Sequence, residues 1–126
     1  MYTVAVTRDF IANHYLIGGD WGDENSPHAH HYVLEVRIES DTLNEHGYLV
    51  DIVEIEAALK DQVDYFRDSM LNDKPEFAGL NPSLEHFSRI LNERLLAGIT
   101  PPGHGALTVK LWENESCWAA FRQSFG

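Results

Sequence analysis

The sequence has 126 residues, of which 44% are hydrophobic, so it is long enough to bury one core, and we expect a single domain over residues 1–126. Its formal net charge is −11, and the nine Lys and Arg residues are scattered singly, which argues against a nucleic-acid partner. One cysteine, no apolar run of membrane-spanning length and a short, uncharged N-terminal segment argue against an internal disulfide, a thiolate-rich zinc site, a membrane span and secretion, so we expect a cytoplasmic protein.

Alternating apolar residues predict two strands in the first third of the chain. The first runs from Tyr2 to about Ala12, and His14 shares its parity with the apolar residues of that segment. If the strand continues regularly, His14 leaves the sheet on the apolar face, although a bulge could shift it. Residues 18–27 are rich in Gly, Asp, Asn and Pro, which predicts a loop of a length that is often functional. Residues 30–38 alternate again and predict a half-buried strand.

Helical spacing predicts two helices in the middle of the chain. Asp51 followed by Glu54 resembles a capping box, and apolar residues then recur at helical spacing over residues 52–66. Asn81 offers an N-cap with Pro82 at the first position of a second helix, which should end near residue 98.

The C-terminal quarter predicts two more strands, at residues 106–113 and 117–124, joined by a short turn at residues 114–115. The order strand, strand, helix, helix, strand, strand predicts an α+β fold, a four-stranded antiparallel sheet with two helices on one face. Such a sheet has two open edges, which favours pairing with other copies of the chain.

The segment from His28 to His30 carries the clearest chemical signal. In an extended strand, residues two apart point the same way, so the two imidazoles share one face at the spacing that a single metal ion needs. His14 is the candidate third ligand, and three histidines with one open position are typical of a catalytic zinc site. From the residues alone, a surface pair or a turn explains His28 and His30 about as well as a metal site does. A structural role explains His14 better than metal binding does. The remaining histidines are interpreted as non-ligands: His31, His46, His86 and His104.

Five groups of short motifs occur in the same order as in a known family. They are FIANHYL at residues 10–16, HAHHY at 28–32, GYLVDI at 47–52, LND at 71–73 with NPSLE at 81–85, and VKLWE at 109–113. On these motifs the chain resembles the 6-pyruvoyl-tetrahydropterin synthase and 6-carboxytetrahydropterin synthase family of zinc enzymes. The resemblance implies the tunnelling fold, with strands that close into a barrel in a homohexamer of two trimers. It also implies a zinc ion bound by His14, His28 and His30 and a small-molecule pterin substrate.

Two glutamates are candidates for binding the pterin. The resemblance implies that Glu113 anchors it, and a carboxylate suits the adjacent N–H donors of the aminopyrimidine edge. Glu113 shares parity with apolar residues of its strand, where a carboxylate needs a partner, although it could also be an ordinary charged strand end. Glu85 is a possible second acceptor, or equally a solvated helix residue.

The chain departs from the family pattern at two places. Family members that make the pyruvoyl or carboxy product carry a cysteine base four residues before the first histidine of the pair, where this chain has Glu24. They also carry an Asp-His pair just before the LN stretch, where this chain has Arg67 and Asp68. Asp68 could supply a replacement acid, or it could be an ordinary solvated residue.

With glutamate in place of the cysteine, the chain resembles a subgroup of the family. This subgroup is implied to cut the side chain of 7,8-dihydroneopterin triphosphate and to leave 6-hydroxymethyl-7,8-dihydropterin. The leading hypothesis is therefore a zinc-dependent pterin side-chain lyase with Glu24 as the base. One alternative is a 6-carboxy- or 6-pyruvoyl-tetrahydropterin synthase with rearranged acid and base groups, and another is a pterin-binding protein without catalysis. The sequence contains no cluster of basic residues that could bind the triphosphate. The scattered candidates for binding it are Arg8, Arg67, Lys74 and Arg89.

Overall fold

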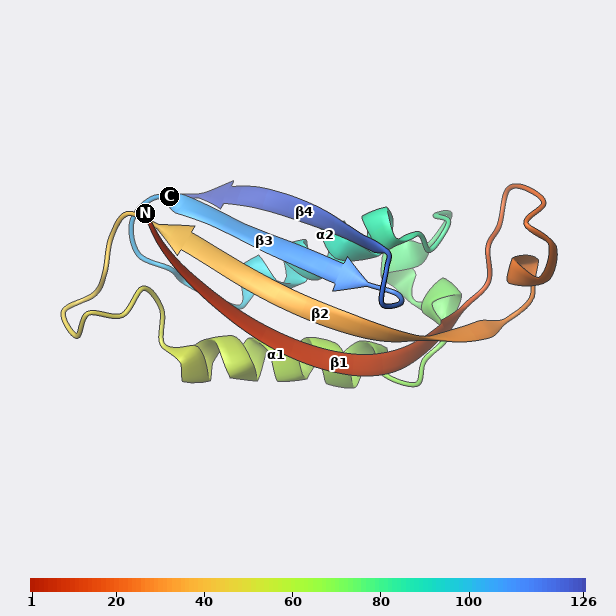
Figure 1. Ribbon diagram of the computed structural model, residues 1–126, viewed down its shortest axis with the longest axis horizontal. Helices are drawn as coiled ribbons and strands as arrows, with labels where there is room; N and C mark the ends of the chain where they lie inside the picture. Colours follow the sequence, from red (N-terminus) through yellow and green to blue (C-terminus); the bar gives the residue numbers. More distant parts are fainter.

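Four long strands form one antiparallel sheet, and two helices cover one of its faces (Figure 1). The computed structural model describes all residues, 1–126, and confirms the predicted order of the elements. The strands and helices are β1 (Tyr2–His14), β2 (His28–Ser40), α1 (Ile52–Phe66), α2 (Leu84–Ala97), β3 (Gly105–Trp112) and β4 (Trp118–Phe125). Three short 3-10 turns lie in the connections: η1 (Gly22–Asn25), η2 (Leu71–Asp73) and η3 (Pro75–Phe77).

The strands lie in the order β1-β2-β3-β4, so β1 and β4 are the edges of the sheet. The β1–β2 pairing runs in one continuous register from Tyr2 opposite Ser40 to His14 opposite His28. Because no bulge interrupts it, the parity of the first strand holds to its end, and His14 is buried on the same face as Phe10. The alternation in the sequence therefore predicts the placement of His14 correctly.

Helix α1 packs along β1, and α2 packs across β3 and β4 (Figure 1). The first helix has the predicted bounds, and the Asp51 carboxylate accepts a hydrogen bond from the Val53 N–H at 2.9 Å. The capping box is not completed, because the Glu54 carboxylate accepts from the Thr100 N–H instead. Neither helix has the length and hydropathy that crossing a lipid bilayer requires.

The second helix begins two residues later than its sequence predicts. Its N-cap is Ser83, whose hydroxyl accepts from the His86 N–H at 3.1 Å. Asn81 instead accepts from the Ile17 N–H at 3.0 Å, and the carbonyl of Pro82 contacts His14. The two residues predicted to start the helix therefore bind the end of β1, and the cap moves to the next residue with a side-chain oxygen.

The last pair of strands also differs slightly from the prediction. Strand β3 ends at Trp112, and the Glu113 N–H donates to the Cys117 carbonyl at 3.2 Å across the turn to β4. Glu113 therefore sits at the start of the turn rather than in the strand. The loop of residues 15–27 leaves one end of the sheet, and the loop after β2 leaves the other end, where both chain termini lie (Figure 1).

Candidate metal centre and its pocket

Three histidines converge where β1 ends and β2 begins. His14 pairs directly with His28, and His30 follows on the same face of β2. Nitrogen atoms of the three rings all lie within 4.8 Å of one another. The structure thus brings together the three residues that the HxH spacing and the parity of His14 indicate.

Hydrogen bonds to backbone carbonyls fix the orientation and tautomer of two of these rings. His14 Nδ1 lies 3.0 Å from the Pro82 oxygen, and His28 Nδ1 lies 2.8 Å from the Ser26 oxygen. A carbonyl oxygen can only accept, so each Nδ1 carries the hydrogen and each neutral ring turns its Nε2 lone pair inward. The two Nε2 atoms are 2.9 Å apart. Two facing lone pairs repel, whereas a cation between them would bind both, so this donor set fits a metal ion.

The environment of His14 keeps it in the neutral form that a metal ion binds. Burial, and then the neighbouring His30 and His28, lower the pKa of His14 from 6.5 to about 4, against an opposing effect of the Pro82 hydrogen bond. Tyr32 places its hydroxyl 3.4 Å from His14 Nδ1. Burial, and then the charge of Glu113, raise the pKa of Tyr32, so its phenol stays protonated.

A pocket of about 220 Å³ opens onto two of the histidines, His14 and His30, while His28 does not line it. Of the residues predicted for the site, His14, His30, Glu24, Glu85 and Glu113 line it. The remaining lining residues are Leu16, Trp21, Asn81, Pro82, Ser83 and Leu84. Three carboxylates therefore share a pocket with the candidate metal ligands, and no lysine or arginine lines it.

Asp68 lies outside this pocket. It follows the C-terminal end of α1, is exposed, and adopts a left-handed backbone conformation with φ of 58°. Its N–H donates to the Ile11 carbonyl at 2.7 Å, which ties the end of the helix to β1. Asp tolerates this conformation better than most residues, so within one chain the position has a structural explanation.

A larger hollow of about 600 Å³ lies between β1 and α1 and contains none of the three histidines. Two of the candidate triphosphate-binding residues, Arg8 and Arg67, line it, but Arg8 is paired with Glu56 at 2.7 Å and Arg67 with Asp64 at 3.2 Å. The other two candidates are also engaged, since Lys74 lies over the Tyr65 ring and Arg89 pairs with Glu93. None of the four reaches the metal pocket of its own chain.

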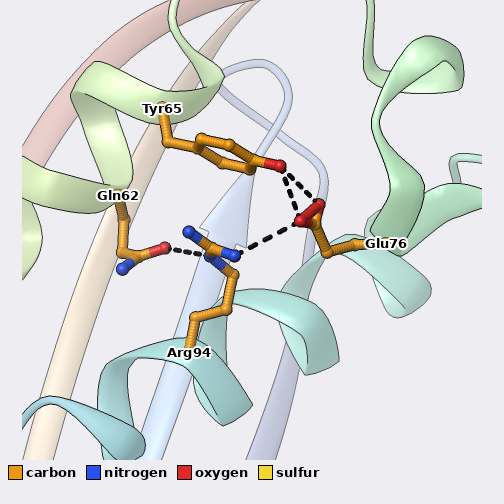
Figure 2. A network of polar contacts seen from close by, with 4 residues as sticks. All are labelled: Gln62, Tyr65, Glu76 and Arg94. Carbon is orange, nitrogen blue, oxygen red and sulfur yellow. Dashed lines mark hydrogen bonds and ion pairs between the residues drawn. The ribbon is translucent and has the colours of Figure 1, made fainter.

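Residues 68–83 support the metal centre from the core side. Asn72 binds both backbone groups of Tyr15, accepting from its N–H at 3.0 Å and donating to its carbonyl at 2.9 Å. The segment is fastened in turn by Glu76, which accepts hydrogen bonds from the Tyr65 hydroxyl at 2.6 Å and from Arg94 at 3.3 Å (Figure 2). Arg94 also donates to Gln62 of α1 at 2.6 Å. This network joins both helices to the segment that holds His14.

Sequence patterns did not identify Trp21 or Asn25. Both lie in the glycine-rich loop, where no periodicity marks a side chain as facing a site. The one available signal was the presence of an apolar Trp among loop-forming residues, and a single exposed apolar side chain does not by itself mark a site.

The family model described as 6-pyruvoyl tetrahydropterin synthase matches residues 3–124. Among solved structures, the Caenorhabditis elegans 6-pyruvoyl tetrahydropterin synthase is similar, with a TM-score of 0.82 at 17% identity over 97% of this chain and 95% of that chain. The Plasmodium vivax 6-pyruvoyltetrahydropterin synthase has a TM-score of 0.76 at 11% identity over 99% of this chain and 100% of that chain. One of its solved variants replaces a catalytic glutamate with alanine. Comparison with curated protein sequences finds no match.

Proposed function

The chain belongs to the 6-pyruvoyl tetrahydropterin synthase family, and we propose that it is a zinc-dependent lyase acting on 7,8-dihydroneopterin triphosphate. Its product would be 6-hydroxymethyl-7,8-dihydropterin. Family membership supports the general activity, processing of a pterin side chain. The presence of Glu24 in the pocket that His14 and His30 line supports the specific reaction.

The main observation in support of this reaction is that a carboxylate, and no thiol, shares the pocket with candidate metal ligands. Cys117 is exposed in the turn between β3 and β4 and does not line the pocket. Glu24 is thus the candidate base in a chain whose one cysteine lies outside the pocket. The Plasmodium vivax protein, described through variants of a catalytic glutamate, supports a carboxylate in such a role.

The proposed reaction needs one base, which takes up a proton and later returns it. His14, His28 and His30 would hold zinc, which when bound acts as a Lewis acid on the side-chain hydroxyls of the substrate. Glu24 takes the proton of the C2′ hydroxyl, the C1′–C2′ bond breaks, and its electron pair moves into the pterin ring. Glu24 then returns the proton to C1′. The second product is a two-carbon aldehyde that carries the triphosphate.

Glu113 would hold the pterin, with Glu85 as a second acceptor. Both carboxylates line the pocket, and the aminopyrimidine edge of a pterin offers adjacent N–H donors that reward bidentate acceptance. Binding at this edge orients the side chain of the pterin toward the histidines and Glu24.

The decisive experiment identifies the product by mass spectrometry after incubating the zinc-loaded protein with 7,8-dihydroneopterin triphosphate. We expect 6-hydroxymethyl-7,8-dihydropterin. A carboxy or pyruvoyl product would instead support the alternative synthase reaction, and tight pterin binding without turnover would support a binding protein.

The variant Glu24→Gln tests the base directly. It should bind zinc and pterin as the wild type does, with turnover lower by about 10²- to 10⁴-fold, because the amide cannot accept the proton. Asp23→Asn is the matched control, since Asp23 is the neighbouring carboxylate of the same loop and does not line the pocket. Unchanged turnover in Glu24→Gln would contradict the assignment.

We also propose that the protein assembles as a homohexamer of two trimers, with sheets that close into barrels. Two features support assembly: β1 and β4 have unpaired edges, and no basic residue of the same chain lines the pocket that would receive a triphosphate. A neighbouring copy could supply such residues, and Asp68 would act only in this way. Light scattering coupled to size-exclusion chromatography measures the assembly, and a monomeric mass would contradict the proposal.

A further inference from the structure

Trp21 is an exposed aromatic residue at the wall of the metal pocket. Its side chain is 45% exposed, and it lines the pocket together with Glu24 and Glu113. Apart from the histidines, it is the only aromatic residue among the lining residues. An indole left in solvent forgoes a large burial energy, which a ligand that covers the ring would recover.

The loop is built to hold the indole in this position. A Cβ atom on Gly19 would lie 2.7 Å from the Trp21 ring, so only glycine lets the ring rest against the backbone there. The side chain of Asn25 accepts a hydrogen bond from the backbone N–H of Trp21 at 2.7 Å. It donates to the backbone carbonyls of Leu16 at 3.1 Å and Gly19 at 3.0 Å. The hydrogen bonds therefore fix the backbone that carries Trp21, and the close approach at Gly19 gives the ring a surface to rest on.

We propose that Trp21 is the stacking residue of the site, packing against the flat face of the heteroaromatic ring whose edge binds Glu113. This proposal rests on the proposed function, because it assumes a planar bicyclic substrate. An edge-binding carboxylate fixes only one direction of such a ring, and its two faces still need partners. Stacking on an aromatic side chain strengthens the binding of a nucleobase by about tenfold or more, and a pterin presents a similar π-face.

The chemistry of stacking separates Trp21 from an ordinary apolar cover. A leucine at this position keeps apolar bulk but has no π-system, whereas a phenylalanine keeps a ring. The contact also involves the ring of the ligand and not its side chain. Its effect should therefore be the same for pterin itself, which has no side chain, and for 7,8-dihydroneopterin.

The test is calorimetric titration of zinc-loaded protein with these two probes. Trp21→Leu should weaken both by about tenfold, and Trp21→Phe should restore most of the affinity. Tyr48→Leu is the matched control, because Tyr48 is 60% exposed and lies in the loop after β2, outside the pocket; it should bind as the wild type does. Zinc content should be equal in all four proteins.

Two results would overturn the stacking role. One is wild-type affinity in Trp21→Leu, and the other is equal losses in the Leu and Phe variants. In either case the proposed function would still stand if the wild-type protein binds the two probes. Failure of the wild-type protein to bind either probe would contradict the proposed function itself, and the stacking role with it.

Discussion

Two segments flank the metal pocket, and they are held in opposite ways. Residues 68–83 bury Leu71, Phe77 and Pro82 and are bound to both helices through the network of Figure 2. Residues 15–27 bury no side chain. Asn25 braces this loop from within, and Asn72 and Asn81 of the inner segment bind the backbone at its start. The inner segment is part of the core, whereas the outer one is a surface loop with its own internal support.

The difference corresponds to a division of tasks. Each segment orients one candidate metal ligand, the inner one through the Pro82 carbonyl on His14 and the outer one through the Ser26 carbonyl on His28. The outer loop carries the side chains that we assign to reaction and substrate, Glu24 and Trp21. A change of base at position 24 therefore leaves the core undisturbed, because this loop buries no side chain, so the same fold can carry different chemistry.

Asn72→Ala breaks the inner side of this comparison and should have the largest effect on the metal. Its two hydrogen bonds fix the backbone of Tyr15, next to His14, so we expect zinc affinity to fall by about 10- to 100-fold. Competition with a zinc chelator measures this affinity. Asn72→Asp keeps the hydrogen bond from the Tyr15 N–H, so its zinc affinity should lie between those of the wild type and Asn72→Ala. Wild-type zinc affinity in Asn72→Ala would mean that the inner segment does not set the metal centre.

Asn25→Ala tests the outer loop and should change turnover without changing the metal. Loss of three hydrogen bonds frees Glu24 from its position, so turnover should fall by about tenfold while zinc affinity stays at the wild-type value. Asn44→Ala is the control, because Asn44 holds the loop at the other end of the sheet through hydrogen bonds from two backbone N–H groups. A fall in zinc affinity in Asn25→Ala would erase the distinction between the segments.

Arg94→Met should have the smallest effect on function. It removes the hydrogen bonds to Gln62 and Glu76, which lie partly in solvent, so the free energy of unfolding should fall by about 1–2 kcal/mol. Urea denaturation measures this change. Turnover at temperatures where the variant is folded should match the wild type, and a clear loss there would show that the network also tunes the site.

The sequence predicted well those features that depend on regular spacing. The periodicity of residues 52–66 gave the bounds of α1, and the parity of β1 placed His14 on the buried face. Both succeed because a buried face repeats along an element. Neither prediction requires knowledge of the segments that pack against the element.

The features that were missed depend on contacts between distant segments. Asn81 has the residue type of an N-cap, but its side chain binds Ile17, a partner that appears only after folding. The turn at Asp68, which ends α1 in a left-handed conformation, also depends on a distant partner, the Ile11 carbonyl, while the role of Asp68 as an acid stays a prediction. Trp21 belongs to a loop whose shape is set by Asn25 and Gly19, and no local pattern in the sequence encodes that arrangement.

The register of the β1–β2 hairpin has a consequence for how the site can diversify. His14 and His28 are paired across the two strands, so the sheet pins both ends of the loop of residues 15–27. For a loop with fixed ends, each doubling of length costs only about 0.6 kcal/mol in closure entropy. Changes in the length of the segment between the two histidines are thus cheap in closure entropy. Selection can rebuild the reactive segment while the ligand positions at its two ends stay where they are.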